Sequence, residues 1–152
     1  MNNRFESFVN SIMTLNRCLQ KLKDVEMKQF GLKANHTMCL YYLGQHSEGL
    51  TSTQLTELCR EDKAAISRSL NQLTAKNLVY SDQSQNKRSY RTLHYLTDSG
   101  KVLAKKMDER IEEVLLNGSN GLSDEQRVVF LEAMALILAN LTQYLNNYEE
   151  ND

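Results

Sequence analysis

The stretch "EDKAAISRSLNQLTAKNLVYSDQSQNKRSYRTLHYLT", residues 61–97, decides the fold of this 152-residue chain. Its first half places Ile66, Leu70 and Leu73 at i, i+4 and i+7, the spacing of one buried helix face. Its second half holds two runs rich in aromatic and β-branched residues, "LVYSD" and "YRTLHYL", around the polar loop "QSQNKRS". The stretch therefore predicts a helix followed by a β-hairpin, a wing, over about 78–96.

A shorter helix is predicted immediately before this stretch. The sequence "GLTSTQLTELCR" begins with a capping box, in which Thr51 and Gln54 satisfy each other's backbone amides. The turn "EDK" follows, with Asp62 placed to cap the next helix. Two helices joined by a tight turn and followed by a hairpin predict a winged helix-turn-helix over 34–97, with its recognition helix at about 63–76.

One more helix is predicted within this region, over 35–46. We expect Met38, Tyr41, Tyr42 and Leu43 to face the core. The whole chain has six glycines and no proline, so long helices joined by short loops are favoured. The predicted fold is mostly α with a small β-hairpin wing.

The two flanks, 1–33 and 98–152, are predicted to be long helices with apolar seams. Apolar residues recur there at alternating spacings of three and four. The seams are Phe5, Phe8, Ile12, Leu15, Leu19 and Leu22 near one end, and Leu131, Met134, Leu138, Leu141, Leu145 and Tyr148 near the other. An intramolecular bundle is one interpretation. Because each seam offers more apolar surface than one small domain covers, we expect instead a homodimer in which these flanks are dimerisation helices.

The distribution of charge sets the middle of the chain apart. The chain has 18 Lys and Arg against 19 Asp and Glu, a net charge of −1. Residues 50–96 hold seven of the cations and only four of the anions, so this window carries +3 and the rest carries −4. A basic middle between acidic ends is typical of a local contact with a polyanion.

The face of the 63–76 helix opposite its apolar residues is suited to DNA. Small side chains allow close approach to the major groove, and Arg and Asn donors reach base edges. The free amides at the helix N-terminus offer a partial positive charge to phosphate, and cations at the hairpin tip can reach the minor groove or the backbone. The predicted DNA-binding residues are Thr53, Lys63, Ala64, Ser67, Arg68, Asn71, Lys87, Arg88 and Arg91. Among them Arg68 is the strongest candidate, with Ser67 and Asn71 next.

The run "LTSTQLTELCREDKAAISRSLNQLTAKNLV…NKRSYRTLHYLTDSGK" resembles the MarR family of bacterial transcriptional regulators, and the flanking helices fit the family's order. The most characteristic pieces are "ISRSLNQLTAKNLV" and "LTDSGK". The resemblance implies a triangular homodimer joined by its terminal helices, in which two winged domains read a pseudo-palindromic operator in double-stranded DNA. Its recognition-helix positions fall on Lys63, Ala64, Ser67, Arg68 and Asn71.

The wing departs from the family pattern at one place. The family usually has Asp-x-Arg there, in which the acid orients an arginine that enters the minor groove. This chain reads Asn86-Lys87-Arg88 instead, so the carboxylate is replaced by an amide. Either Arg88 or Arg91 is the candidate for insertion.

The resemblance also implies a small-ligand pocket between the dimer helices and the winged domain. The candidate lining residues are His36, Tyr41, Tyr42 and Cys18. The alternative is that both tyrosines are core aromatics and His36 is a polar residue at a helix start. Redox sensing by Cys18, which lies between Arg17 and Lys21, is a further hypothesis.

The other two cysteines, Cys39 and Cys59, have apolar neighbours and are interpreted as packing residues. With an odd number of widely spaced cysteines, a disulfide framework is not expected. The pair His36-x-x-Cys39 lacks a second pair of ligands, so no metal site is expected.

Several classes of function lack support in the sequence. It contains no Gly-rich phosphate loop, no HExxH and no nucleophile elbow, so we expect neither an enzyme nor a cofactor. No secretory signal and no apolar run of about 20 residues is evident, which favours a cytoplasmic protein with no membrane contact. The predicted function is a homodimeric, sequence-specific DNA-binding regulator, a repressor released by a small ligand. The alternatives are a winged-helix protein-interaction module without DNA affinity and a cysteine-based redox-sensing repressor.

Overall fold

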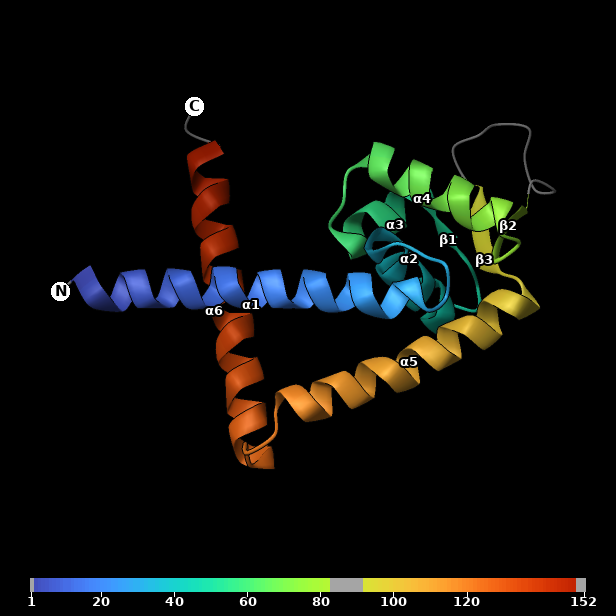
Figure 1. Cartoon of the computed structure of the whole chain (residues 1–152). Coiled ribbons are helices and arrows are strands. Elements are labelled where there is room, and N and C mark those ends of the chain that lie inside the picture. The colour runs from blue at the N-terminus through green and yellow to red at the C-terminus, as the bar shows by residue number, and fades with distance from the viewer. Residues whose placement is uncertain (1, 83–91, 150–152) are drawn as a thin grey trace. The chain divides into compact units, whose positions relative to one another are not determined.

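The computed structural model describes residues 2–82 and 92–149 (Figure 1). The chain divides into two compact units, Met1–Asp108 and Glu109–Asp152. In chain order the described elements are α1 (Asn2–Lys28), α2 (Ala34–Gln45), β1 (Leu50–Thr51), α3 (Ser52–Cys59), α4 (Lys63–Ala75), β2 (Val79–Asp82), β3 (Leu93–Leu96), α5 (Asp98–Gly118) and α6 (Asp124–Glu149). The predicted mostly helical fold with a small β-sheet is confirmed.

The core of the first unit lies between α2, α3, α4 and the sheet, which pack against one another. The predicted apolar face of α4 is confirmed, because Ile66, Leu70 and Leu73 are all buried. They join buried side chains from every other element of the unit, namely Met27, Leu32, Cys39, Leu40, Leu43, Leu50, Leu55, Val79, Leu96, Ala104 and Met107. This core fixes which face of α4 is left for solvent.

The wing is the edge of a three-stranded antiparallel sheet with the order β1-β3-β2. Strand β3 pairs with β2 from Val79 opposite Leu96 to Asp82 opposite Leu93, as the predicted hairpin requires. It also pairs with β1, where Leu50 lies opposite His94. The two-residue strand β1 was not predicted, because so short a segment carries no alternation of apolar and polar residues.

The predicted helix caps are confirmed. The Thr51 and Gln54 side chains form the capping box of α3, and the Asp62 carboxylate accepts a 2.7 Å hydrogen bond from the Ala65 amide at the start of α4. A third cap of the same kind begins α6, where the Ser123 hydroxyl accepts from the Gln126 amide. These side chains satisfy amides that would otherwise lack partners, and so fix where each helix begins.

The inward face of α2 differs from the prediction. The buried residues are His36, Thr37, Cys39, Leu40 and Leu43. Met38, Tyr41 and Tyr42, which were predicted to point inward, are only half-buried. Because α1, α3, α4 and β3 all pack against α2, its buried face follows the i, i+3, i+4, i+7 positions that start at residue 36. The prediction was right for Leu43, and Tyr42 packs against the core cluster, but the prediction missed His36, Thr37, Cys39 and Leu40.

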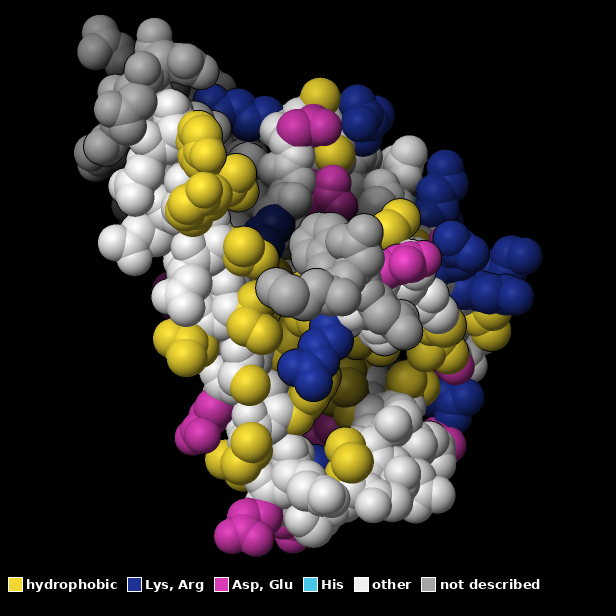
Figure 2. Space-filling model, turned by 90° about the vertical axis from the view of Figure 1, so that its left-hand side faces the viewer, with side chains coloured by type: hydrophobic (Ala, Val, Ile, Leu, Met, Phe, Trp, Pro, Cys, Tyr) yellow, Lys and Arg dark blue, Asp and Glu magenta, His cyan; other side chains and the backbone are white. Residues whose placement is uncertain are grey.

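The flanking helices expose the apolar seams that the sequence predicted. On α1, Phe8, Leu15, Leu19 and Leu22 are exposed. On α6, Leu131, Leu138, Leu141, Leu145 and Tyr148 are exposed, and none of the apolar residues of this helix is buried. Figure 2 shows exposed apolar side chains, in yellow, on one face of the molecule.

The expectation that no segment is apolar enough to cross a membrane is wrong for α6. An 18-residue window within Asp124–Tyr148 reaches a mean hydropathy of 1.6, so this helix qualifies by length and composition alone. The charged residues Asp124, Glu125 and Arg127 lie at its start, and the stretch that follows contains few charges to lower its mean hydropathy. A long helix that carries an apolar seam for another helix meets the same criterion.

Candidate nucleic-acid interface

The exposed face of α4 carries the residues that were predicted to contact DNA. Lys63, Ala64, Ser67, Arg68 and Asn71 are all exposed, on the side of the helix opposite its buried leucines and isoleucine. Within the described part of the chain, none of their side chains has a recorded hydrogen-bond or ion-pair partner. Their donors are therefore available to an external ligand, and the small side chains of Ala64 and Ser67 leave room for it.

The N-terminus of α4 is less open to phosphate than its sequence suggested. The Asp62 carboxylate already bonds the Ala65 amide, and Glu61 adds a second exposed acid next to it. Both negative charges lie beside Lys63. A polyanion approaching this end of the helix therefore meets acids as well as the positive end of the helix dipole, so its contacts are better made further along α4.

Two side-chain hydrogen bonds join the first turn of α2 to the inward face of α4. The Asn35 amide donates to the Ser69 hydroxyl at 2.9 Å, and the His36 Nε2 atom lies 2.8 Å from the Gln72 carbonyl oxygen. Ser69 is buried, as is His36. The recognition helix is thus positioned by polar contacts as well as by its apolar face.

The hydrogen bonds of His36 fix its tautomer. Its Nδ1 atom accepts from the Lys33 backbone amide at 3.2 Å, so Nε2 carries the proton and donates to Gln72. Burial lowers the pKa of His36, against the opposing effect of the Gln72 hydrogen bond. The ring therefore stays neutral, and it joins the start of α2 to α4. Sequence reasoning missed this role, since the partners are 36 residues apart.

A second histidine positions the wing. The His94 ring on β3 lies 3.0 Å from the Ser52 hydroxyl at the start of α3 and 3.0 Å from the Ser81 hydroxyl on β2. Burial lowers the pKa of His94. On the same pair of strands, the Tyr80 and Tyr95 rings stack with centroids 5.4 Å apart. These contacts hold β2 and β3 against the start of α3, and no local sequence pattern predicts them.

The remaining predicted DNA contacts divide into two groups. Thr53 is exposed in the first turn of α3. Lys87, Arg88 and Arg91, together with Asn86, lie outside the described residues. Their roles, and the choice between Arg88 and Arg91, stay predictions.

The predicted effector residues are distributed over two helices. Tyr41 and Tyr42 on α2 are half-buried and contact each other edge to face, with ring centroids 5.3 Å apart. Cys18 is exposed on α1. His36 has both ring nitrogens engaged in the protein. A role of these residues in ligand binding stays a prediction.

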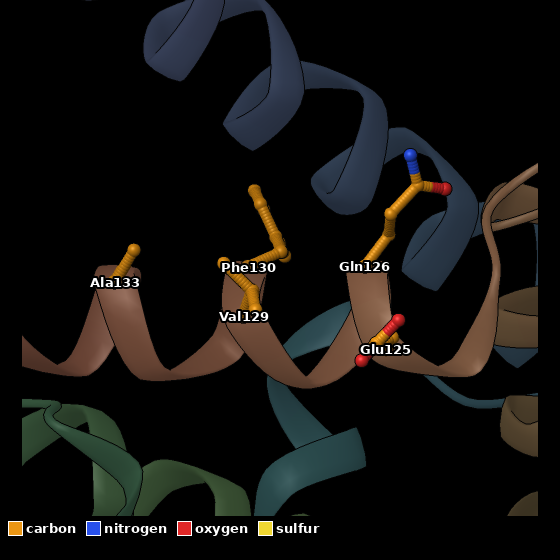
Figure 3. A pocket seen from close by; sticks show the side chains of 5 residues that line it. All are labelled: Glu125, Gln126, Val129, Phe130 and Ala133. Carbon is orange, nitrogen blue, oxygen red and sulfur yellow. The ribbon is translucent and has the colours of Figure 1, made fainter.

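A different hollow lies on α6. Figure 3 shows the side chains that line it, which are Glu125, Gln126, Val129, Phe130 and Ala133. It includes none of the predicted effector residues. Within residues 2–82 and 92–149, no group of three His, Cys, Asp or Glu side chains is placed to hold a metal ion.

Comparison with known proteins relates this geometry to one family. Residues 30–89 match the model of the MarR family. The Staphylococcus aureus MepR–DNA complex superposes with a TM-score of 0.75 at 21% identity, covering 93% of this chain and 99% of that chain. Staphylococcus aureus MarR in complex with salicylate and kanamycin superposes with a TM-score of 0.80 at 17% identity, covering 93% of this chain and 95% of that chain. A MarR transcriptional regulator from Methanosarcina mazei Go1 superposes with a TM-score of 0.79 at 19% identity, covering 91% of this chain and 99% of that chain. No curated protein matches the sequence.

Proposed function

We propose that this chain is a MarR-family winged-helix DNA-binding transcriptional regulator that acts as a homodimeric, sequence-specific repressor. The proposal is supported by the match of residues 30–89 to the family model and by the fold that nearly the whole chain shares with the MarR-family structures. The observation that supports it most is the exposed face of α4, which is held in place from behind by Asn35 and His36. A rigid helix that presents unpaired donors is what base readout requires.

A homodimer is supported by the apolar seams of α1 and α6. These side chains are exposed in the single chain, and exposed apolar surface of this extent marks an interaction site. A second copy supplies a matching seam without any further partner. Two copies also present two recognition helices, which suits a pseudo-palindromic operator in double-stranded DNA.

Release by a small ligand is the regulatory part of the proposal. It is supported by the salicylate and kanamycin bound by the S. aureus MarR structure of the same fold. The predicted pocket would be lined by His36, Tyr41 and Tyr42 on α2, and by Cys18 on the preceding helix, α1. A regulator of this kind would act in the cytoplasm, where its DNA lies.

The proposal is tested by fluorescence anisotropy of the purified protein with DNA from upstream of its own gene. Scrambled DNA of the same length is the control, and both are titrated across a salt series. We expect tighter binding to the native fragment that persists near physiological salt, at one dimer per site. Equal binding that vanishes with salt would contradict an operator in this fragment. No binding even at low salt would favour a protein-interaction module.

A further inference from the structure

Two cysteines that are 20 residues apart in the sequence lie side by side in the core. The Cys39 Sγ atom on α2 is 4.0 Å from the Cys59 Sγ atom on α3. Both were interpreted as packing residues, and both do contribute to the core cluster. Their proximity adds a possibility that packing alone does not require, because a disulfide needs two sulfur atoms at such close approach.

The two thiols differ in access and in acidity. Cys39 is fully buried, whereas Cys59, the last residue of α3, is half-buried. The hydrogen bond from Cys39 lowers the pKa of the Cys59 thiol, against burial and the nearby Glu61 carboxylate. The same hydrogen bond, together with burial, raises the pKa of Cys39. Cys59 is thus the thiol that solvent reaches and that ionises first.

We propose that Cys39 and Cys59 form an oxidant-sensing dithiol, in which Cys59 reacts with a hydroperoxide and Cys39 resolves the product as an intramolecular disulfide. The Cys59 thiolate attacks one peroxide oxygen, the O–O bond breaks, and after protonation an alcohol or water leaves, which gives a sulfenic acid. The Cys39 sulfur then attacks the Cys59 sulfur, the S–O bond breaks, and water leaves with the Cys39 proton. Two thiols are oxidised and one peroxide is reduced.

The position of the pair connects this chemistry to the recognition helix. Closing the bond shortens the sulfur separation from 4.0 Å to about 2 Å. In a close-packed core such a contraction moves the end of α3 relative to α2. Arg60, in a left-handed conformation, Glu61 and Asp62 are all that separate this end from α4. The disulfide therefore acts on the turn that sets the angle between α3 and the recognition helix.

The chemistry is tested on the full-length reduced protein by adding hydrogen peroxide and mapping thiols by mass spectrometry under non-reducing conditions. We expect a Cys39–Cys59 link and a protein lighter by two hydrogen atoms. The matched control Cys18→Ser keeps both changes, whereas Cys59→Ala loses the link and retains an apolar side chain for packing. Both thiols remaining open to alkylation after denaturation, or reaction of Cys18 alone, would overturn the proposal.

The consequence for DNA rests on the proposed function and is measured separately. Once the link is verified, we expect the oxidised protein to bind the native promoter fragment about 5- to 150-fold more weakly, the usual range of allosteric coupling. A reducing agent restores binding, and Cys59→Ala binds equally with and without peroxide. Unchanged affinity despite a complete link would overturn the sensing role. Failure of the reduced protein to bind DNA would contradict the proposed function, while the thiol map would still decide the chemistry.

Discussion

His36 carries the pH dependence of the contact between α2 and α4. In the unfolded chain a histidine takes up a proton near pH 6.5, whereas burial in the native state lowers the pKa of His36. Below pH 6.5 the unfolded state therefore binds more protons than the native state. The free energy of unfolding must fall as the pH is lowered from about 6.5, until the pH drops below the lowered pKa of His36.

The variant His36→Gln removes this titration and the rigid ring that bridges the Lys33 amide and Gln72. We expect it to lower the free energy of unfolding at pH 7.5 by about 1–3 kcal/mol and to flatten its dependence on pH between 7 and 5. Urea denaturation at several pH values measures both effects. His46→Gln is the control, since His46 is partly exposed in a contact with Glu48. The half-buried His94, whose pKa is also lowered by burial, contributes to the pH dependence equally in both variants. Equal slopes in wild type and His36→Gln would contradict the assignment.

Arg68 tests the readout of DNA at the same scale. Arg68→Ala should weaken binding to the native fragment by about 1–3 kcal/mol. Arg68→Lys keeps the charge but loses the planar pair of donors that matches a base edge. We expect it to bind scrambled DNA as wild type does, while losing preference for the native fragment in anisotropy. Retained preference would mean that Arg68 contacts only phosphates.

At the scale of elements, the start of α5 is joined to the segment that leaves α4. The Thr97 hydroxyl donates to the Asn77 carbonyl at 2.7 Å, and the Thr97 amide donates to the Leu78 carbonyl at 3.0 Å. The same hydroxyl accepts from the Gly100 amide at 3.0 Å. A Cβ at Gly100 would overlap the Leu78 carbonyl oxygen, which explains why the motif "LTDSGK" needs glycine there.

Gly100→Ala should therefore displace α5 from this junction. We expect a loss of about 1–3 kcal/mol in the free energy of unfolding, as for other overpacked sites. Gly118→Ala, at the far end of the same helix, is the matched control, since a Cβ there meets no atom within 4 Å. It should be neutral or stabilising by up to about 1 kcal/mol. Chemical denaturation of the two variants side by side decides, and similar losses in both would refute the steric explanation.

The sequence could predict the elements whose signals are local. The spacing of Ile66, Leu70 and Leu73 and the caps at Thr51 and Asp62 depend on residues within two helical turns. The resemblance of the middle of the chain to a known family also allowed the order of the elements to be predicted. The exposed donors of α4 followed directly, because burying one face of a helix leaves the other face to solvent.

The parts that could not be predicted depend on contacts between distant segments. The buried face of α2 is set by four neighbouring elements, so a prediction centred on its aromatic residues missed His36, Cys39 and Leu40. The contacts of His36 with Gln72, of His94 with Ser52 and of Cys39 with Cys59 join residues 36, 42 and 20 positions apart. No periodicity within one segment encodes such pairs.

For the whole molecule, the exposed seams predict assembly. Leu141→Glu on α6 places a charge within the seam, where it would be desolvated without a partner in a dimer. We expect the wild type to sediment as a dimer and Leu141→Glu to shift toward the monomer at micromolar concentration. Gln143→Glu, an exposed polar position outside the seam, is the control and should leave the mass unchanged. A monomeric wild type, or its recovery with lipid vesicles on flotation, would contradict the dimer.

The junction at Thr97 makes the first turn of α5 a lever for the recognition helix. Backbone and hydroxyl bonds tie that turn to Asn77 and Leu78, directly after α4 ends. If α5 changes direction, we expect the recognition helix to move with it, because these hydrogen bonds hold the two helices together at the junction. In a dimer, the distance between the two recognition helices determines which spacing of DNA half-sites the protein can bind. The spacing of the operator half-sites would then report the direction of α5, and a ligand that tilts this helix would move the two recognition helices out of register with their half-sites.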